Sequence, residues 1–76
     1  MPNEIFPDIE VRHDTRFGKP VIKGTRVPVG LVVGKIAGGM TVQEVAQEYD
    51  LTREQVFVAL QYAAKLVAEE ELAVGA

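Results

Sequence analysis

Two helix-start signatures lie eleven residues apart in this chain, and they constrain its fold more than any other feature. Thr41 is followed three positions later by Glu44, and Thr52 is followed three positions later by Gln55. At this spacing the two residues form a capping box, in which each side chain accepts a hydrogen bond from the other residue's backbone N–H. Apolar residues flank both boxes at the positions of a hydrophobic staple: Met40 and Val45 around the first, Leu51 and Val56 around the second. The pattern therefore predicts where two helices begin.

These signatures predict a short helix over about residues 42–49 and a longer one from near residue 53 to about residue 71. Only Asp50, Leu51 and the capping Thr52 lie between them, which is the order of a helix-turn-helix motif. Apolar residues occupy the positions that such a motif buries: Val45, Tyr49, Leu51, Val56 and Leu60. Many three-helix domains that never bind DNA share this motif, so it predicts fold better than function.

The N-terminal half carries weaker signals. Residues 9–12 alternate apolar and polar side chains as a strand does, and Val21-Ile22 is a second β-prone segment after a polar turn over residues 13–18. Pro28 suits the first position of a further helix, which Gly38-Gly39 would end. Two prolines and the lack of any periodicity predict a flexible arm over residues 1–8.

The predicted fold is therefore mainly α. It is a homeodomain-like three-helix bundle of the helix-turn-helix type with a short N-terminal β-hairpin, forming one domain over residues 9–72, followed by a tail at 73–76. Gly30 and Gly34 lie four residues apart in the first of the three helices, where each costs about 1 kcal/mol relative to alanine. Their shared face either allows another helix to approach closely or leaves the helix loose.

Composition argues against an enzyme. The chain of 76 residues has no cysteine, no serine and a single histidine, His13, so disulfides, thiolate metal sites and serine triads are excluded. The glycine-rich stretch at residues 18–30 lacks the pattern of a nucleotide-binding loop. We therefore expect no catalytic residue, no metal and no cofactor. No stretch is long and apolar enough to span a membrane, and we expect a cytoplasmic protein.

Charge is distributed unevenly. Residues 1–40 carry six basic and four acidic residues, a net charge of +2, whereas residues 41–76 carry two and seven, a net charge of −5. An acidic chain does not favour tight non-specific binding of nucleic acid, because that affinity comes from cations that neutralise phosphates. The residues that could still contact DNA are basic residues near the glycine-rich stretch and polar residues on the last helix: Lys19, Lys23, Arg26, Thr52, Arg53, Gln55 and Gln61.

The last helix is apolar on nearly every side. Its segment VFVALQYAAKLVA, residues 56–68, contains only Gln61 and Lys65 as strongly polar residues. Such a helix is usually buried on more than one face, and so small a domain cannot surround it. We expect a second chain, either another copy or a different protein, to cover the residues that lie off the core stripe: Phe57, Val58, Tyr62, Ala64, Leu66 and Ala68. The alternative is that the N-terminal strands cover this extra face.

The segment GKPVIKGTRVPV, together with GGMTVQEV, YDLTREQV and ALQYAA, resembles the small proteins of the "domain of unknown function 433" family, which are regarded as antitoxin-like. The resemblance covers about residues 8–66. It rests on the segment Gly24, Thr25, Arg26, Val27, Pro28 and Val29, on the glycine turn at Gly39, and on Leu51, Thr52 and Val56 at the start of the last helix.

The resemblance implies a homeodomain-like three-helix fold, dimerisation, and pairing with a PIN-like nuclease toxin. We accordingly expect an antitoxin that binds this toxin and its own promoter DNA as a dimer; the alternative is a protein-interaction module that binds no DNA. Structural roles are expected for Gly24, through an unusual backbone angle, and for Thr25 or Val27, as the cap of the first helix. Arg26 would either form an ion pair with an acid such as Glu48 or Asp50 or contact a phosphate.

Overall fold

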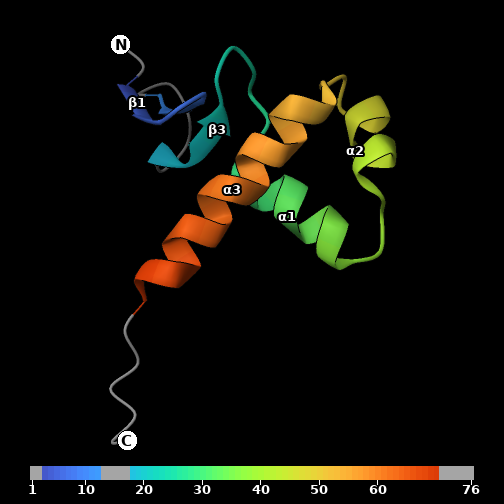
Figure 1. Cartoon of the computed structure of the whole chain (residues 1–76). Helices are drawn as coiled ribbons and strands as arrows, with labels where there is room; N and C mark the ends of the chain where they lie inside the picture. The colour runs from blue at the N-terminus through green and yellow to red at the C-terminus, as the bar shows by residue number, and fades with distance from the viewer. Residues whose placement is uncertain (1–2, 13–17, 71–76) are drawn as a thin grey trace, which may run out of the picture.

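A computed structural model describes residues 3–12 and 18–70 of the chain (Figure 1). This part contains three helices and a small antiparallel sheet. The elements are β1 (Asn3–Phe6), β2 (Ile9–Val11), β3 (Pro20–Ile22), α1 (Val29–Ala37), α2 (Val42–Glu48) and α3 (Arg53–Glu69). The predicted short helix, turn and long helix are therefore present as α2, residues 49–52 and α3. Residues 13–17 of the predicted turn at 13–18 lie outside the described residues, as does the predicted tail at residues 73–76.

The sheet has the order β1-β2-β3, and both pairs of strands are antiparallel. The prediction of a flexible arm over residues 1–8 was wrong for residues 3–6, which form β1; residues 1–2 lie outside the described part. The reversal between β1 and β2 contains Asp8 at a φ of 65°, a left-handed conformation that aspartate tolerates. The Asp8 backbone N–H also donates to Glu4 Oε2 at 3.1 Å, which closes the turn.

Both capping boxes are confirmed. Thr41 Oγ1 accepts from the Glu44 backbone N–H at 3.1 Å and Glu44 Oε1 accepts from the Thr41 N–H at 2.8 Å. At α3 the corresponding distances are 3.0 Å to Thr52 Oγ1 and 2.8 Å to Gln55 Oε1. These reciprocal bonds satisfy backbone donors that a helix start otherwise leaves free. The starts of α2 and α3 therefore coincide with the predicted residues.

The start of α1 differs from the prediction. Pro28, expected as the first helical residue, is the N-cap, with an extended φ and ψ of −68° and 142°, and no side chain caps the helix. Neither Thr25 nor Val27 is the cap. Pro28 instead forms an isolated antiparallel bridge with Val21 of β3, so the chain stays extended for one residue longer before the helix begins.

The core lies where the sheet, α1 and α2 meet the first half of α3. Its members come from every one of these elements: Ile9, Ile22, Val29, Val32, Val45, Ala46, Leu51, Val56, Ala59 and Tyr62. The α3 helix contacts α1, α2, β2 and β3, and in Figure 1 it runs diagonally through the molecule. Its last turns extend beyond the sheet and the other helices, and residues 64–70 are all exposed.

Candidate functional site

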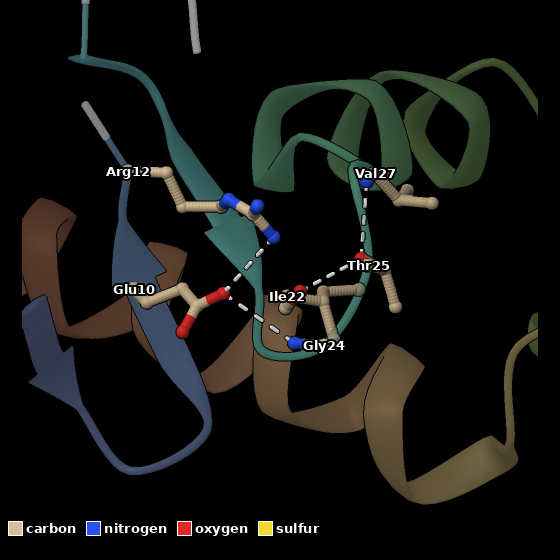
Figure 2. A network of polar contacts seen from close by, with 6 residues as sticks. All are labelled: Glu10, Arg12, Ile22, Gly24, Thr25 and Val27. Atoms are coloured by element: carbon tan, nitrogen blue, oxygen red, sulfur yellow. Dashed lines mark hydrogen bonds and ion pairs between the residues drawn. The ribbon is translucent and has the colours of Figure 1, made fainter. Parts of the chain in front are cut away.

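The loop over residues 23–28, here called the GTRVP loop, is a structural joint held by its own hydrogen bonds (Figure 2). Thr25 Oγ1 donates to the Ile22 carbonyl at 2.7 Å and accepts from the Val27 N–H at 3.0 Å. The Ile22 N–H in turn donates to the Val27 carbonyl at 3.0 Å. Gly24 has a φ of 78°, which a residue with a side chain adopts only at a cost, so the expected role of this glycine is confirmed.

A buried carboxylate supports the same loop. Glu10 of β2 is only 6% exposed, and its Oε1 accepts from the Gly24 N–H at 3.4 Å and lies 3.8 Å from Arg12 Nη1 (Figure 2). Glu10 was not predicted as a site residue, because its alternation with Ile9 and Val11 is typical of a solvent-facing position in a strand. An acid and an arginine two positions apart in a strand share one face, and that spacing was the available signal.

The three basic residues expected to contact phosphates, Lys19, Lys23 and Arg26, are all exposed. Lys23 Nζ already lies 3.6 Å from Glu4 Oε2, so part of its charge is offset by β1. The choice for Arg26 between an ion pair with α2 or its following turn and a phosphate contact stays a prediction.

The expected base-reading residues at the start of α3 have separate roles. Thr52 and Gln55 are engaged in the capping box, as described above. Arg53 lies over the Phe57 ring, with its guanidinium carbon 5.8 Å from the ring centroid, which is a cation–π geometry. Gln61 is exposed. Of the four candidates, therefore, only Arg53 and Gln61 have side chains that are not used to cap the helix.

Exposed residues of α3 line up along its outer face, opposite the core. They recur at intervals of three or four positions, which places them on one side of a helix: Arg53, Phe57, Gln61, Ala64 and Ala68. We call this set the outer face of α3. Phe57 is 42% exposed although it is a large aromatic residue. The segment that leads into this face is acidic, since residues 41–54 carry Glu44, Glu48, Asp50 and Glu54 against the single cation of Arg53.

The six residues expected at a protein interface divide into three groups. Tyr62 belongs to the core, at 9% exposed, and Val58 is half-buried against it. The Phe6 ring of β1 packs on Tyr62 with a centroid separation of 5.5 Å, so at this position the alternative that an N-terminal strand covers α3 is confirmed. Phe57, Ala64 and Ala68 lie on the outer face. Leu66, 46% exposed, lies on a different side of the helix.

Leu66 contributes to a groove between α1 and the C-terminal half of α3. The groove has a volume of about 520 Å³ and is mostly apolar. It is lined by Pro20, Val29, Gly30, Val33, Gly34, Tyr62, Ala63, Leu66, Val67 and Glu70. We call it the α1–α3 groove. It brings together Gly30 and Gly34, which share one face of α1, and the exposed end of α3.

Within residues 3–12 and 18–70 no group of histidine and acidic side chains is arranged to hold a metal ion. None of the helices in these ranges combines the length and the apolar character needed to cross a membrane.

Comparison with known proteins places the chain in a family. No curated protein and no solved structure matches it. The family model described as "Protein of unknown function (DUF433)" matches residues 9–63. The matched segment contains β2, β3, the GTRVP loop, α1, α2 and more than half of α3, and it ends before the exposed turns of α3 begin. This chain is therefore a member of the DUF433 family.

Proposed function

We propose that this protein is the antitoxin of a prokaryotic toxin–antitoxin pair and that it acts by binding a second protein, a PIN-like nuclease toxin, through the outer face of α3. The observation that carries the proposal is the exposure of Phe57 in the middle of a capped and well-packed part of this helix. A large aromatic side chain that is partly exposed on a rigid element is typical of protein interfaces, in which aromatic residues including phenylalanine are enriched. Such an antitoxin would act in the cytoplasm, on the homeodomain-like scaffold suggested by its three helices.

The chemistry of this face also fits a protein partner. Arg53 above the Phe57 ring and Gln61 one turn further along supply polar groups around an apolar centre, and Ala64 and Ala68 leave the far end of the face smooth. The acidic segment over residues 41–54 favours a partner surface that carries arginine or lysine. The same acidic segment would repel a phosphate backbone.

The test is co-expression with the protein encoded by the neighbouring gene, followed by co-purification. Phe57→Asp should abolish capture of this protein, because a carboxylate would replace the apolar centre of the face. Ile5→Asp is the matched control: Ile5 is 47% exposed on β1 and is not part of the outer face of α3, so this variant should capture the partner as well as the native chain does. Equal capture by both variants, or none by the native chain, would rule out the outer face as the toxin-binding surface.

Promoter binding by a dimer is the second candidate, and the exposure of Arg53 and Gln61 on the second helix of the motif favours it. Two weak half-sites would gain affinity when linked. Retardation of promoter DNA at low salt that is lost in Arg53→Ala would support this activity. If the native chain retards no promoter DNA but still captures its partner, it is a protein-interaction module without DNA binding.

A further inference from the structure

We infer that the outer face of α3 is a single site that holds either the protein partner or duplex DNA but not both, so that capture of the partner releases promoter DNA. This inference rests on the proposed function, since it concerns how the two proposed activities are regulated at one surface. What it adds is that each activity excludes the other.

The residues that would serve the two activities alternate along one side of α3. Arg53 and Gln61, the candidates for reading bases, lie one turn before and one turn after Phe57, the centre of the proposed protein interface. At a rise of 1.5 Å per residue, each of them is only about 6 Å from Phe57 along the helix axis. The guanidinium carbon of Arg53 also lies 5.8 Å from the centroid of the Phe57 ring. The two sets of residues therefore form one continuous surface.

A protein bound at the centre of this surface would cover all of it. Stable protein interfaces bury about 800 Å² on each partner, which corresponds to a patch roughly 30 Å across. The outer face from Arg53 to Ala68 is only about 22 Å long at 1.5 Å per residue. A partner centred on Phe57 would thus bury Arg53 and Gln61 as well, and neither side chain would reach a base edge.

The width of the major groove imposes the same limit from the side of the DNA. The groove is about 12 Å wide, and an α-helix with its side chains is about 10–12 Å across. A helix that reads bases fills this groove, so no room remains for a second protein on the face that points to the bases. Phe57 would itself lie in the groove, where an aromatic ring can pack against the methyl group of thymine.

Charge determines which occupant is displaced. Glu48, Asp50 and Glu54 are exposed in the segment that leads into the first turn of α3. Their carboxylates repel a phosphate backbone, whereas they attract a protein surface that carries arginine or lysine. DNA is therefore the weaker occupant, and the partner displaces it.

The experiment follows the fluorescence anisotropy of a labelled duplex that carries the DNA upstream of the gene. The duplex is bound to the full-length chain at low salt, and the protein encoded by the neighbouring gene is then added; the duplex with this protein alone gives the baseline. With free partner at ten times its own dissociation constant, the apparent dissociation constant for DNA should rise about elevenfold, as mass action requires for two ligands of one site.

Variants test whether the surface is shared. Phe57→Asp should lose both ligands, because its carboxylate would lie at the centre of the protein interface and, in the major groove, close to the negative charge of DNA. Ile5→Asp, on β1, should retain both. Circular dichroism of each variant checks that its helices are intact. A Phe57→Asp chain that loses the partner but binds DNA with native affinity would overturn the inference.

The remaining outcomes separate this inference from the proposed function. A ternary complex of chain, partner and duplex, seen in a native gel as a band that the partner and duplex alone do not give, would overturn the inference and leave the pairing with the partner in place. A chain that captures its partner but binds no duplex would have the same two consequences. A native chain that captures no partner would instead refute the proposed function, and the inference with it.

Discussion

Replacing Phe6 by alanine tests whether the strand β1 helps to hold α3 in place. Phe6 is half-buried, and its ring lies 5.5 Å from that of Tyr62, with 58° between the two ring planes. Removing a fully buried phenylalanine side chain costs about 3–5 kcal/mol, so about 2 kcal/mol is expected for this half-buried one. About 1 kcal/mol of this belongs to the contact between the two rings. For a chain of this size the melting temperature should fall by roughly 8–16 °C.

The measurement is thermal unfolding followed by far-UV circular dichroism, at a protein concentration at which native chain and variants are monomeric. Ile5→Ala is the matched control, since Ile5 is the neighbouring residue of the same strand and is 47% exposed; it should change the unfolding free energy by no more than about 0.5 kcal/mol. Tyr62→Phe keeps the ring and should also have little effect, because the Tyr62 hydroxyl makes no hydrogen bond with the described residues.

A double-mutant cycle isolates the ring contact from the other losses. Phe6→Ala and Tyr62→Leu should together cost about 1 kcal/mol less than the sum of the single effects, because either change alone already removes the contact. A melting temperature for Phe6→Ala equal to that of Ile5→Ala, or additive effects in the cycle, would refute the packing of β1 on α3.

Other predictions concern single residues and are checked by urea unfolding of the monomer. Thr52→Ala should cost about 1 kcal/mol and Thr52→Ser much less, because serine can rebuild the capping box of α3; equal losses would contradict the role of the hydroxyl. Gly24→Ala should destabilise the chain by about 1 kcal/mol, because Gly24 has a φ of 78°. Gly34→Ala should instead stabilise the chain by about 1 kcal/mol, because Gly34 lies within α1 and a Cβ atom there would meet no other atom within 4 Å. Effects of the same sign at the two glycines would disprove this reasoning. Glu10→Leu should lower the free energy of unfolding by about 1 kcal/mol more than Glu10→Gln does, since glutamine retains an oxygen that can accept from the Gly24 N–H. Equal losses of stability in the two variants would show that this hydrogen bond does not contribute to stability.

The parts of the fold that could be predicted from the sequence are those set by short-range chemistry. Thr41 with Glu44 and Thr52 with Gln55 determine two helix starts through bonds that span three residues, so the relevant partners are adjacent in the sequence. The strand β1 could not be found in this way, because its hydrogen bonds come from β2 and its one aromatic anchor, Tyr62, lies more than fifty residues away. Pro28 was placed one position too far into the helix for the same reason, since its bridge to Val21 is a tertiary contact.

The same distinction between short-range and tertiary contacts applies to the candidate site. Apolar residues off the main stripe of α3 could be recognised from the sequence, but their division between the core, the outer face and the groove depends on where β1 and α1 end. Tyr62 meets Phe6 and becomes buried, while Leu66, one turn later on a neighbouring side of the helix, lies beyond the reach of any strand. Tertiary contacts also change the interpretation of a basic residue in the N-terminal half. Lys23 was predicted to contact phosphate, but in the structure it lies beside Glu4 of β1, a strand that was not predicted.

The length of α3 links these surfaces. The helix has 17 residues, about 26 Å at 1.5 Å per residue, and the buried residues on it lie between Val56 and Tyr62. A shorter helix ending near residue 63 would close the same core, and the family match ends there. The additional turns contribute Leu66 and Val67 to a groove with two glycines rather than to the core. None of the other described residues buries these two side chains, so the expectation that a second chain covers Leu66 stays a prediction. Truncation after residue 63 should therefore leave the helical bundle folded, because every buried residue of α3 is retained. A truncated chain that unfolds would instead assign the last turns of α3 to the stability of the monomer.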